Sequence, residues 1–429
     1  MRASRHSMPG LSGLPVQLIP HDSNHNIKKM IICIAGKHSC SVKAARHIDE
    51  NYPAVDLRVL PNRDDDGLDT WQPSLRAWAR RARVQETTLE ELYLQKELIF
   101  VSIEYDRLIT PQRFASQALY NIHFSLLPEY KGSYCSVWPI LDGKKNAGIT
   151  LHRIDPGIDT GDIIAQVDFP IGSDDTSRDV YQRFLDACMD LFPLWLPRLL
   201  AGSVEARPQP AQGSTFRSRK SIDYSSLSIE LKQTAENIRN QVRAFAFPEY
   251  QMPKVHGRPV RRVEILNQRS FERPGTLLHE NLESITIATV DFDVRLMKDE
   301  LSLLLEACRN GNVDHMDYYV ERVASLESRS REGWTPLILA SYHGHSALVG
   351  KLLRAGASPQ TPNYKGTTPL MYAMSPAAER GIFDPLRMLI ASGADVDAHD
   401  AHGRSALSYA NERGWLSVVE LLMKSQTKH

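Results

Sequence analysis

An eight-residue signature occurs three times near the C-terminal end of the chain, and it restricts that region to a stack of similar units. The copies read GWTPLILA from Gly333, GTTPLMYA from Gly366 and GRSALSYA from Gly403, so they begin 33 and 37 residues apart. A unit of this length cannot bury its apolar face alone, and three or more copies must stack to form a continuous core. The sequence therefore predicts an all-α repeat array, which a chain of 429 residues can carry beside other domains.

The period indicates the class of repeat. Each signature is followed by an apolar helical segment, which reads LVGKLLRAGAS, LRMLIASGADV or VVELLMKS. A 33-residue unit with a TPL turn and a Gly-Ala turn is similar to the ankyrin repeat. We expect about four units over residues 299–429. The segment LLEACRNGNVDHMDYYV would be the first unit, and MSPAAERGIFDP would hold the four extra residues of the longer spacing.

Apolar strands alternate with helices over residues 30–205. The expected strands are Met30–Gly36, Val55–Pro61, Glu97–Ile103, Leu119–Phe124, Ala147–Ile154 and Asp162–Ile171, and the expected helices cover 41–51, 71–83 and 176–200. Nearly continuous apolar strands in this alternation predict a Rossmann-like α/β domain, with a mostly parallel sheet covered on both faces. Ligands of such sheets bind at the carboxyl ends of the strands.

The remaining segments complete the predicted organisation. Residues 1–29 are interpreted as a flexible extension. Residues 206–298 are interpreted as a linker and a small β-rich subdomain, with an amphipathic helix over 228–245 and a hairpin turn at His256 and Gly257. Because exposed strand edges invite pairing, this subdomain favours a homodimer.

The stretch from Asn121 to Asp162 contains the groups needed to move an acyl unit onto an amine. Asn121 supplies an N–H donor for a carbonyl oxygen, and a protonated His123 would supply a second. The attacking amine must lose a proton, and Asp159 in the IDTG loop is the candidate acceptor. Taken singly, the three residues are better explained as a strand end, a core histidine and a loop cap. The catalytic interpretation depends on their occurrence together.

This stretch resembles the catalytic core of the formyltransferase family that uses N10-formyltetrahydrofolate, and the resemblance covers about residues 30–265. The matching positions are Asn121, His123, Ser125, Leu126, Leu127, Pro128, Tyr130, Gly132, Gly157, Asp159, Thr160 and Gly161. The resemblance implies that Asn121, His123 and Asp159 are catalytic. It also implies N10-formyltetrahydrofolate as the co-substrate, with no metal. Phe124 departs from the family, which more often has Pro there, and suggests a subfamily with its own acceptor.

The resemblance also implies where the folate binds, and the spacing of cationic and aromatic residues suggests where the second substrate binds. The residues expected at the folate are Ser102, Tyr105, Asp106, Asp155 and Gly157. The residues expected at the second substrate are Lys131, Tyr134, Arg219, Lys220, Arg243, Phe247 and Tyr250. Cationic and aromatic side chains of this kind can hold a pyrophosphate and stack a base, although a core end with surface charges explains the linker and helix residues equally well.

The layout is most similar to the sugar N-formyltransferases that act on dTDP-linked amino-dideoxy sugars, of which a subset carries ankyrin repeats. This resemblance implies a dTDP-amino sugar as acceptor, a 3-amino-3,6-dideoxyhexose in particular, used for surface polysaccharide such as the O-antigen of lipopolysaccharide. Composition agrees, because Lys plus Arg and Asp plus Glu both number 51. A nucleic-acid partner usually requires a basic excess, so none is expected.

Cysteine spacing and hydropathy indicate which sites are absent and in which compartment the protein is expected. No two of the five cysteines have CxxC spacing, so neither a zinc site nor a redox dithiol is supported. No apolar run reaches the length of about 18 residues that a membrane span needs, so no membrane association is expected. Scattered single cysteines are typical of a reducing compartment, and we expect a cytoplasmic protein.

Two alternative functions stay open at this point. The chain could formylate methionyl-tRNA or a ribonucleotide amine, or it could be an ankyrin interaction protein with a vestigial transferase fold. The array itself would bind a protein or a second nucleotide-sugar. The aromatic residues that could stack a nucleotide there are Trp334, Tyr342, Tyr364 and Tyr372. Packing between the helices of the array explains the same residues.

Overall fold

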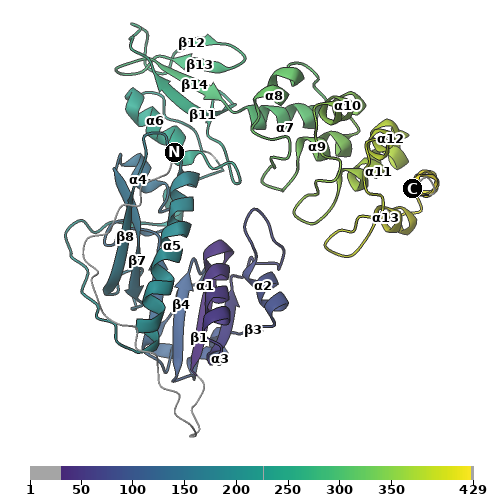
Figure 1. The fold of residues 1–429 in the computed structure, drawn as a ribbon. Coiled ribbons are helices and arrows are strands. Elements are labelled where there is room, and N and C mark those ends of the chain that lie inside the picture. Colours follow the sequence, from purple (N-terminus) through teal and green to yellow (C-terminus); the bar gives the residue numbers. More distant parts are fainter. Residues whose placement is uncertain (1–29, 226, 427–429) are drawn as a thin grey trace, which may run out of the picture.

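A computed structural model of the chain describes residues 30–225 and 227–426. It shows three parts in chain order: an α/β body, a smaller second sheet and a row of helices that extends away from both (Figure 1). The extension expected over residues 1–29 lies outside the described residues. The order of the three parts confirms the predicted α/β, β-rich and all-α regions.

The main sheet has seven strands in the order β3-β2-β1-β4-β5-β7-β8. The first five run parallel, whereas β7 and β8 are antiparallel to their neighbours. The strands are β1 (Ile31–Gly36), β2 (Asp56–Pro61), β3 (Gln85–Glu86), β4 (Leu98–Ile103), β5 (Ala118–His123), β7 (Asn146–Arg153) and β8 (Ile163–Pro170). The predicted mostly parallel sheet is confirmed.

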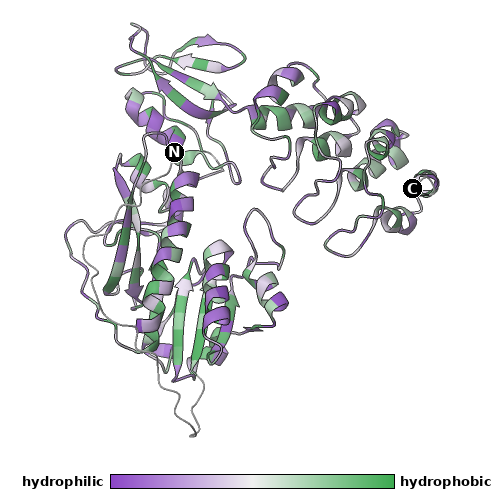
Figure 2. Cartoon of the chain, in the orientation of Figure 1, coloured by the Kyte–Doolittle hydropathy of each residue, from purple (hydrophilic) through white to green (hydrophobic). Residues whose placement is uncertain are grey.

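Helices cover the two faces of this sheet unequally. The helices of the α/β body are α1 (His38–Asn51), α2 (Leu75–Ala82), α3 (Leu89–Tyr93), α4 (Trp138–Leu141) and α5 (Ser177–Leu200). α1 and α5 pack on the face that carries Val101, and a smaller apolar group surrounds Phe100 on the other face. The strands are apolar along most of their length, whereas the helices are amphipathic (Figure 2). Because side chains alternate along a strand, Ser102, Asn121 and His123 share the face of Phe100.

Two helices begin later than the sequence analysis placed them. α2 begins at Leu75 instead of residue 71, because the Ser74 side chain accepts a hydrogen bond from the first turn and caps it. α6 (Ala235–Phe245) begins after the capping residue Thr234, seven residues later than expected from 228. Trp71 therefore lies outside any helix, and it packs among other aromatic side chains.

The second sheet follows the linker and has the strand order β10-β11-β14-β13-β12. Its strands are β10 (Lys254–Val255), β11 (Arg258–Ile265), β12 (Leu277–Glu280), β13 (Ser284–Ile287) and β14 (Val294–Lys298), and α6 packs against β11. The linker itself turns back to the α/β body, where β9 (Phe216–Arg217) pairs in parallel with β6 (Lys131–Gly132). The linker is thus attached to the catalytic motif by main-chain hydrogen bonds.

The C-terminal helices form four consecutive pairs that share one apolar core (Figure 1). The helices are α7 (Glu300–Asn310), α8 (Met316–Arg322), α9 (Pro336–His343), α10 (Ser346–Arg354), α11 (Pro369–Arg380), α12 (Asp384–Ala391), α13 (Ala406–Glu412) and α14 (Leu416–Gln426). α11 has 12 residues where α9 has 8, so the four extra residues lengthen one helix by about a turn. No helix in the described part of the chain is long and apolar enough to span a bilayer.

Candidate active site

Three side chains from two segments meet at the carboxyl end of β5. Asn121 and His123 project from the strand, and Asp159 lies in the loop between β7 and β8. Asn121 Nδ2 donates a hydrogen bond to Asp159 Oδ1 at 3.2 Å, and His123 Nδ1 lies 3.5 Å from Asp159 Oδ2. The structure therefore brings Asn121 and His123 both into contact with Asp159, which their separate structural roles would not require.

The loop before Asp159 is shaped by its own polar groups. Asp159 has a φ of 54°, in the left-handed region that Asp and Asn tolerate better than most residues. Asp155 Oδ1 accepts hydrogen bonds from the Gly157 N–H at 3.1 Å and from the Thr160 hydroxyl at 2.7 Å. A Cβ on Gly157 would stand 1.9 Å from that hydroxyl, so only glycine fits. Asp155 and Gly157, which the resemblance placed at the folate, thus hold the loop that carries Asp159.

The catalytic motif and the linker both form hydrogen bonds with Asp159. The Gly132 N–H donates to Asp159 Oδ2 at 2.9 Å. Gln209 Nε2 donates to the main-chain carbonyls of Asp159 and Gly161, both at 2.8 Å. Two residues expected at the second substrate also meet the linker. Lys131 Nζ donates to Ser214 Oγ at 3.1 Å, and the Tyr134 ring centroid lies 5.1 Å from that of Tyr224.

His123 is buried, and both of its ring nitrogens face acceptors. Nδ1 faces Asp159, while Nε2 lies 3.0 Å from the Tyr130 carbonyl oxygen and 3.5 Å from Cys135 Sγ. Only a doubly protonated ring can donate to both oxygens. Burial alone lowers the pKa of His123, but Cys135, Asp159 and the Tyr130 carbonyl outweigh burial and raise the pKa to about 10. His123 is therefore an imidazolium at neutral pH.

A second histidine, which the sequence analysis did not select, borders the same carboxylate. His152 on β7 is the cross-strand partner of Asn121, and it is only 2% exposed. Its Nε2 lies 3.1 Å from Asn121 Nδ2 and 3.7 Å from Asp159 Oδ1. Burial lowers the pKa of His152 to about 4, because the opposing effect of Asp159 is smaller and the charge of His123 acts in the same direction as burial. The signal in the sequence was a buried polar residue within the apolar strand AGITLHRI.

The remaining residues expected at the folate lie at the end of β4. Ser102 is the neighbour of Asn121 in the parallel pairing of β4 with β5, and it is buried. The Tyr105 ring packs 6.4 Å from the Phe100 ring, measured between centroids. The Asp106 carboxylate forms an ion pair with Arg63 at 3.2 Å. Of these three residues, Ser102 alone is paired directly with the catalytic strand.

An aromatic cluster of Trp71, Tyr181, Phe247 and Tyr250 occupies the same edge of the sheet. The Trp71 ring centroid lies 5.6 Å from Phe247, 5.8 Å from Tyr250 and 6.0 Å from Tyr181. The Tyr181 hydroxyl lies 3.0 Å from both carboxylate oxygens of Glu104, which directly follows β4, and burial raises the pKa of Glu104 to about 7. Phe247 and Tyr250 were expected at the second substrate, whereas Trp71, the centre of the cluster, was expected in a helix that in fact begins at Leu75.

The cationic residues expected near these rings have different surroundings. The Arg243 guanidinium is buried and donates to the main-chain carbonyls of Gly172 at 2.9 Å and Asp175 at 3.2 Å, so it holds a loop of the fold. Arg219 and Lys220 are exposed on a short turn after β9. Phe124, the departure from the family pattern, stacks on Phe184 of α5 with 5.2 Å between ring centroids. Phe124 therefore fastens β5 to α5.

The helical array carries a second aromatic group, made of Trp334, Tyr342 and Tyr372. The Trp334 ring centroid lies 5.1 Å from Tyr342 and 4.9 Å from Tyr372. Tyr342 is 42% exposed, so part of this surface faces solvent. Tyr364 packs instead over Gly333, where a Cβ would stand 2.4 Å from its ring. Three of the four aromatic residues expected to stack a nucleotide thus lie together.

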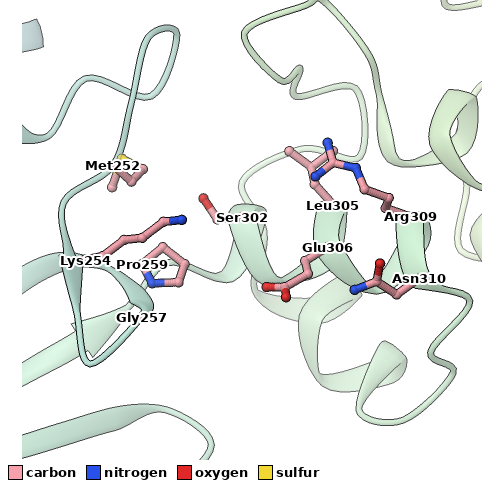
Figure 3. A pocket seen from close by; sticks show the side chains of 9 residues that line it. All are labelled: Met252, Lys254, Gly257, Pro259, Ser302, Leu305, Glu306, Arg309 and Asn310. Atoms are coloured by element: carbon pink, nitrogen blue, oxygen red, sulfur yellow. The ribbon is translucent and has the colours of Figure 1, made fainter. Parts of the chain in front are cut away.

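A groove of about 470 Å³ separates the second sheet from the first helix of the array. Lys254 borders it on the hairpin, and Glu306 and Arg309 border it on α7 (Figure 3). None of the residues expected at a catalytic or ligand-binding site lines this groove. The groove is therefore separate from the contacts between Asn121, His123 and Asp159.

Fold and site together define the class: a formyl transferase sheet followed by ankyrin repeats. A family model described as formyl transferase matches residues 21–196, and ankyrin-repeat models match residues 304–376 and 365–401. The crystal structure of an N-formyltransferase from Helicobacter canadensis, in complex with folinic acid and dTDP-3-aminofucose, is 37% identical. It aligns with a TM-score of 0.58 over 62% of this chain and 99% of its own.

Two further proteins show similar relationships. WlaRD, a sugar 3N-formyl transferase whose structure was determined with dTDP and 5-N-formyl-THF, is 37% identical, with a TM-score of 0.59 over 63% of this chain and 98% of its own. The methionyl-tRNA formyltransferase of Bordetella petrii is 32% identical over 182 residues, which cover 42% of this chain and 56% of that protein. The chain therefore belongs to the sugar N-formyltransferase family. The segment that matches the methionyl-tRNA enzyme spans only about half the length of that enzyme.

Proposed function

We propose that the chain transfers the formyl group of N10-formyltetrahydrofolate to the amine of a dTDP-linked amino-dideoxy sugar. The observation that carries this proposal is the contact of Asn121, His123 and Asp159 at a sheet edge that also bears the aromatic cluster. The similarity to a protein whose structure pairs folinic acid with dTDP-3-aminofucose supports it. By that similarity the acceptor is a 3-amino-3,6-dideoxyhexose. From the family resemblance alone, we propose that the product serves surface polysaccharide.

The contacts distribute the chemistry over the three residues. Asp159 carries the negative charge of the group and takes the proton that the attacking amine loses. Asn121 donates an N–H to the formyl oxygen as negative charge develops there, a contribution typically worth about 2.7–4 kcal/mol. His123 has both N–H groups directed at Asp159 and Tyr130, so it acts through its positive charge and not through a free N–H.

The aromatic cluster suits the nucleotide half of the acceptor. Stacking of a base on an aromatic ring contributes about 1–3 kcal/mol, and it tolerates different bases because each has a π face. Tyr250 is 40% exposed, so part of the cluster is accessible from solvent. The partly neutral Glu104 beside Tyr181 can both donate and accept hydrogen bonds.

An assay of tetrahydrofolate release tests the proposal. Purified protein would be mixed with N10-formyltetrahydrofolate and with a panel of dTDP-linked sugars that carry the amine on different carbons, with methionyl-tRNA in a parallel reaction. We expect turnover with at least one 3-amino sugar and none with tRNA. Turnover with tRNA and with no sugar nucleotide would establish the alternative, a methionyl-tRNA formyltransferase.

A second nucleotide-sugar site on the ankyrin array is favoured by the contact of Trp334 with Tyr342 and Tyr372, since Tyr342 remains partly exposed. Calorimetric titration of the full chain with dTDP would report two sites per chain, and Trp334→Ala would reduce this to one. A stoichiometry of one in both proteins would leave protein binding, the usual role of such repeats, as the function of the array.

A homodimer formed through the second sheet also remains a prediction. Phe271 and Phe292 on loops of this subdomain are exposed, Phe292 by 50%. Large apolar side chains that gather on one surface favour association. Sedimentation velocity of the wild type and of a Phe271→Ser, Phe292→Ser variant would test this, and a monomeric wild type would exclude it.

A further inference from the structure

His152 completes the surroundings of Asn121, and its own hydrogen bonds define which tautomer it adopts. Its Nδ1 lies 2.7 Å from the carbonyl oxygen of Arg153, an atom that can only accept, so the ring proton resides on Nδ1. Nε2 is therefore left with a lone pair, and it faces Asn121 Nδ2 at 3.1 Å. Burial keeps the ring neutral, since the pKa of His152 is lowered to about 4.

The Asn121 amide thus has two acceptors on the same side. Nδ2 lies 3.2 Å from Asp159 Oδ1 and 3.1 Å from His152 Nε2, and these two atoms are 3.7 Å apart. By the law of cosines they subtend an angle of about 70° at Nδ2, whereas the two hydrogens of a planar amide nitrogen diverge by about 120°. The nitrogen of the Asn121 amide, and not its oxygen, therefore faces both acceptors, and an N–H becomes available to a ligand when Asp159 takes a proton and its contact is released.

The two acceptors also oppose reversal of the amide. A flip would place Asn121 Oδ1 against the Asp159 carboxylate and the His152 lone pair, and both contacts would be repulsive. Asp159 supplies this constraint only while it is ionised, and it takes a proton during the proposed reaction. His152 stays an acceptor throughout, because nothing in its surroundings protonates it at neutral pH.

We propose that His152 is a positioning residue, which holds the N–H of Asn121, and not its carbonyl, toward the formyl oxygen. The inference rests on the proposed formyl transfer, but it does not depend on which amine accepts the group. His152 touches neither substrate in this arrangement and acts only through Asn121.

A double-mutant cycle tests the coupling. His152→Phe keeps an aromatic ring but removes the acceptor, and we expect kcat to fall about tenfold or more while the KM for folate and for the acceptor changes less than threefold. In an Asn121→Ala background the same substitution should cause no further loss. His152→Gln, whose side-chain oxygen can accept from Asn121, should recover part of the activity.

The matched control is His47→Phe, because His47 lies on α1, which covers the opposite face of the sheet. It should leave kcat unchanged. The cycle would be measured with whichever acceptor, sugar nucleotide or tRNA, gives turnover with the wild type. A wrong assignment of the sugar can then be told apart from a wrong role for His152. Effects of His152→Phe and Asn121→Ala that multiply independently, or a change confined to KM, would overturn the positioning role.

Discussion

Replacement of Asp159 by Asn perturbs the proposed site with little change to the backbone. Asn tolerates the left-handed φ of 54° as Asp does, so the loop keeps its shape. The substitution removes the negative charge 3.5 Å from His123 Nδ1 and converts one carboxylate oxygen into an NH2 donor. That donor would face the Gly132 N–H or the Asn121 amide, and both of these are donors themselves.

The size of the effect on His123 follows from Coulomb's law. Two unit charges 3.5 Å apart attract by about 5 kcal/mol at an effective dielectric constant of about 20. One pH unit in a pKa corresponds to about 1.4 kcal/mol. Loss of Asp159 should therefore lower the pKa of His123 by about three and a half pH units from its raised value of about 10, to near neutrality.

Two measurements check this reasoning. The NMR titration of the His123 Cε1–H resonance, with labelled histidine, should show the lowered pKa in Asp159→Asn, and kcat should fall about a hundredfold or more. Asp168→Asn is the control, since it removes an exposed carboxylate on β8 that is not among the groups raising the pKa of His123, and it should keep that pKa high. A pKa that stays near 10 in Asp159→Asn, or turnover within tenfold of the wild type, would refute the argument.

The other predictions concern four residues. The pKa of His123 is raised above its ordinary value of 6.5, so the stability gained from its charge is complete below pH 6.5 and is lost as the pH rises through about 10. Thermal stability and turnover should therefore decline together over this alkaline range. Glu104→Gln should stabilise the protein by about 1–3 kcal/mol in urea unfolding at pH 8 but not at pH 4, because burial disfavours the ionised carboxylate of Glu104, whose pKa is raised to about 7; an equal gain at both pH values would contradict this. Trp71→Ala should raise the KM for the nucleotide sugar about tenfold with the KM for folate unchanged, and equal changes in both would remove Trp71 from the base site. Gly157→Ala should lower kcat, since its Cβ would collide with the Thr160 hydroxyl 1.9 Å away, and full activity would show that the loop adapts.

The contacts of the catalytic strand could be predicted because their geometry is local. Asn121 and His123 are two residues apart on an apolar strand, so they must project from the same face of the sheet. The position of Asp159 beside them is different, since 35 residues and two strands lie between His123 and Asp159. It followed only from the family resemblance, because no periodicity in one segment fixes where a distant loop returns.

His152 and Trp71 show what local patterns leave undetermined. The pairing of His152 with Asn121 depends on the register of β7 against β5, and neither strand specifies that register alone. Trp71 shares a helical face with Leu75 and Trp78 in the sequence, which favoured a longer helix. The structure begins the helix after Ser74, whose side chain caps the first turn. Greater weight on the capping signal than on apolar spacing would have placed Trp71 in the loop.

The linker connects the loop that carries Asp159, the proposed proton acceptor, with the aromatic cluster, the proposed site of the nucleotide base. Gln209 holds the main-chain carbonyls of Asp159 and Gly161, and β9 pairs with β6 next to the Gly132 N–H that binds the Asp159 carboxylate. The same continuous segment leads through α6 to Phe247 in the aromatic cluster. A base stacked on that cluster would therefore restrain the linker at its far end, and through the linker the loop of Asp159. The proposed nucleotide site and the loop of Asp159 are therefore both contacted by one continuous segment of the chain.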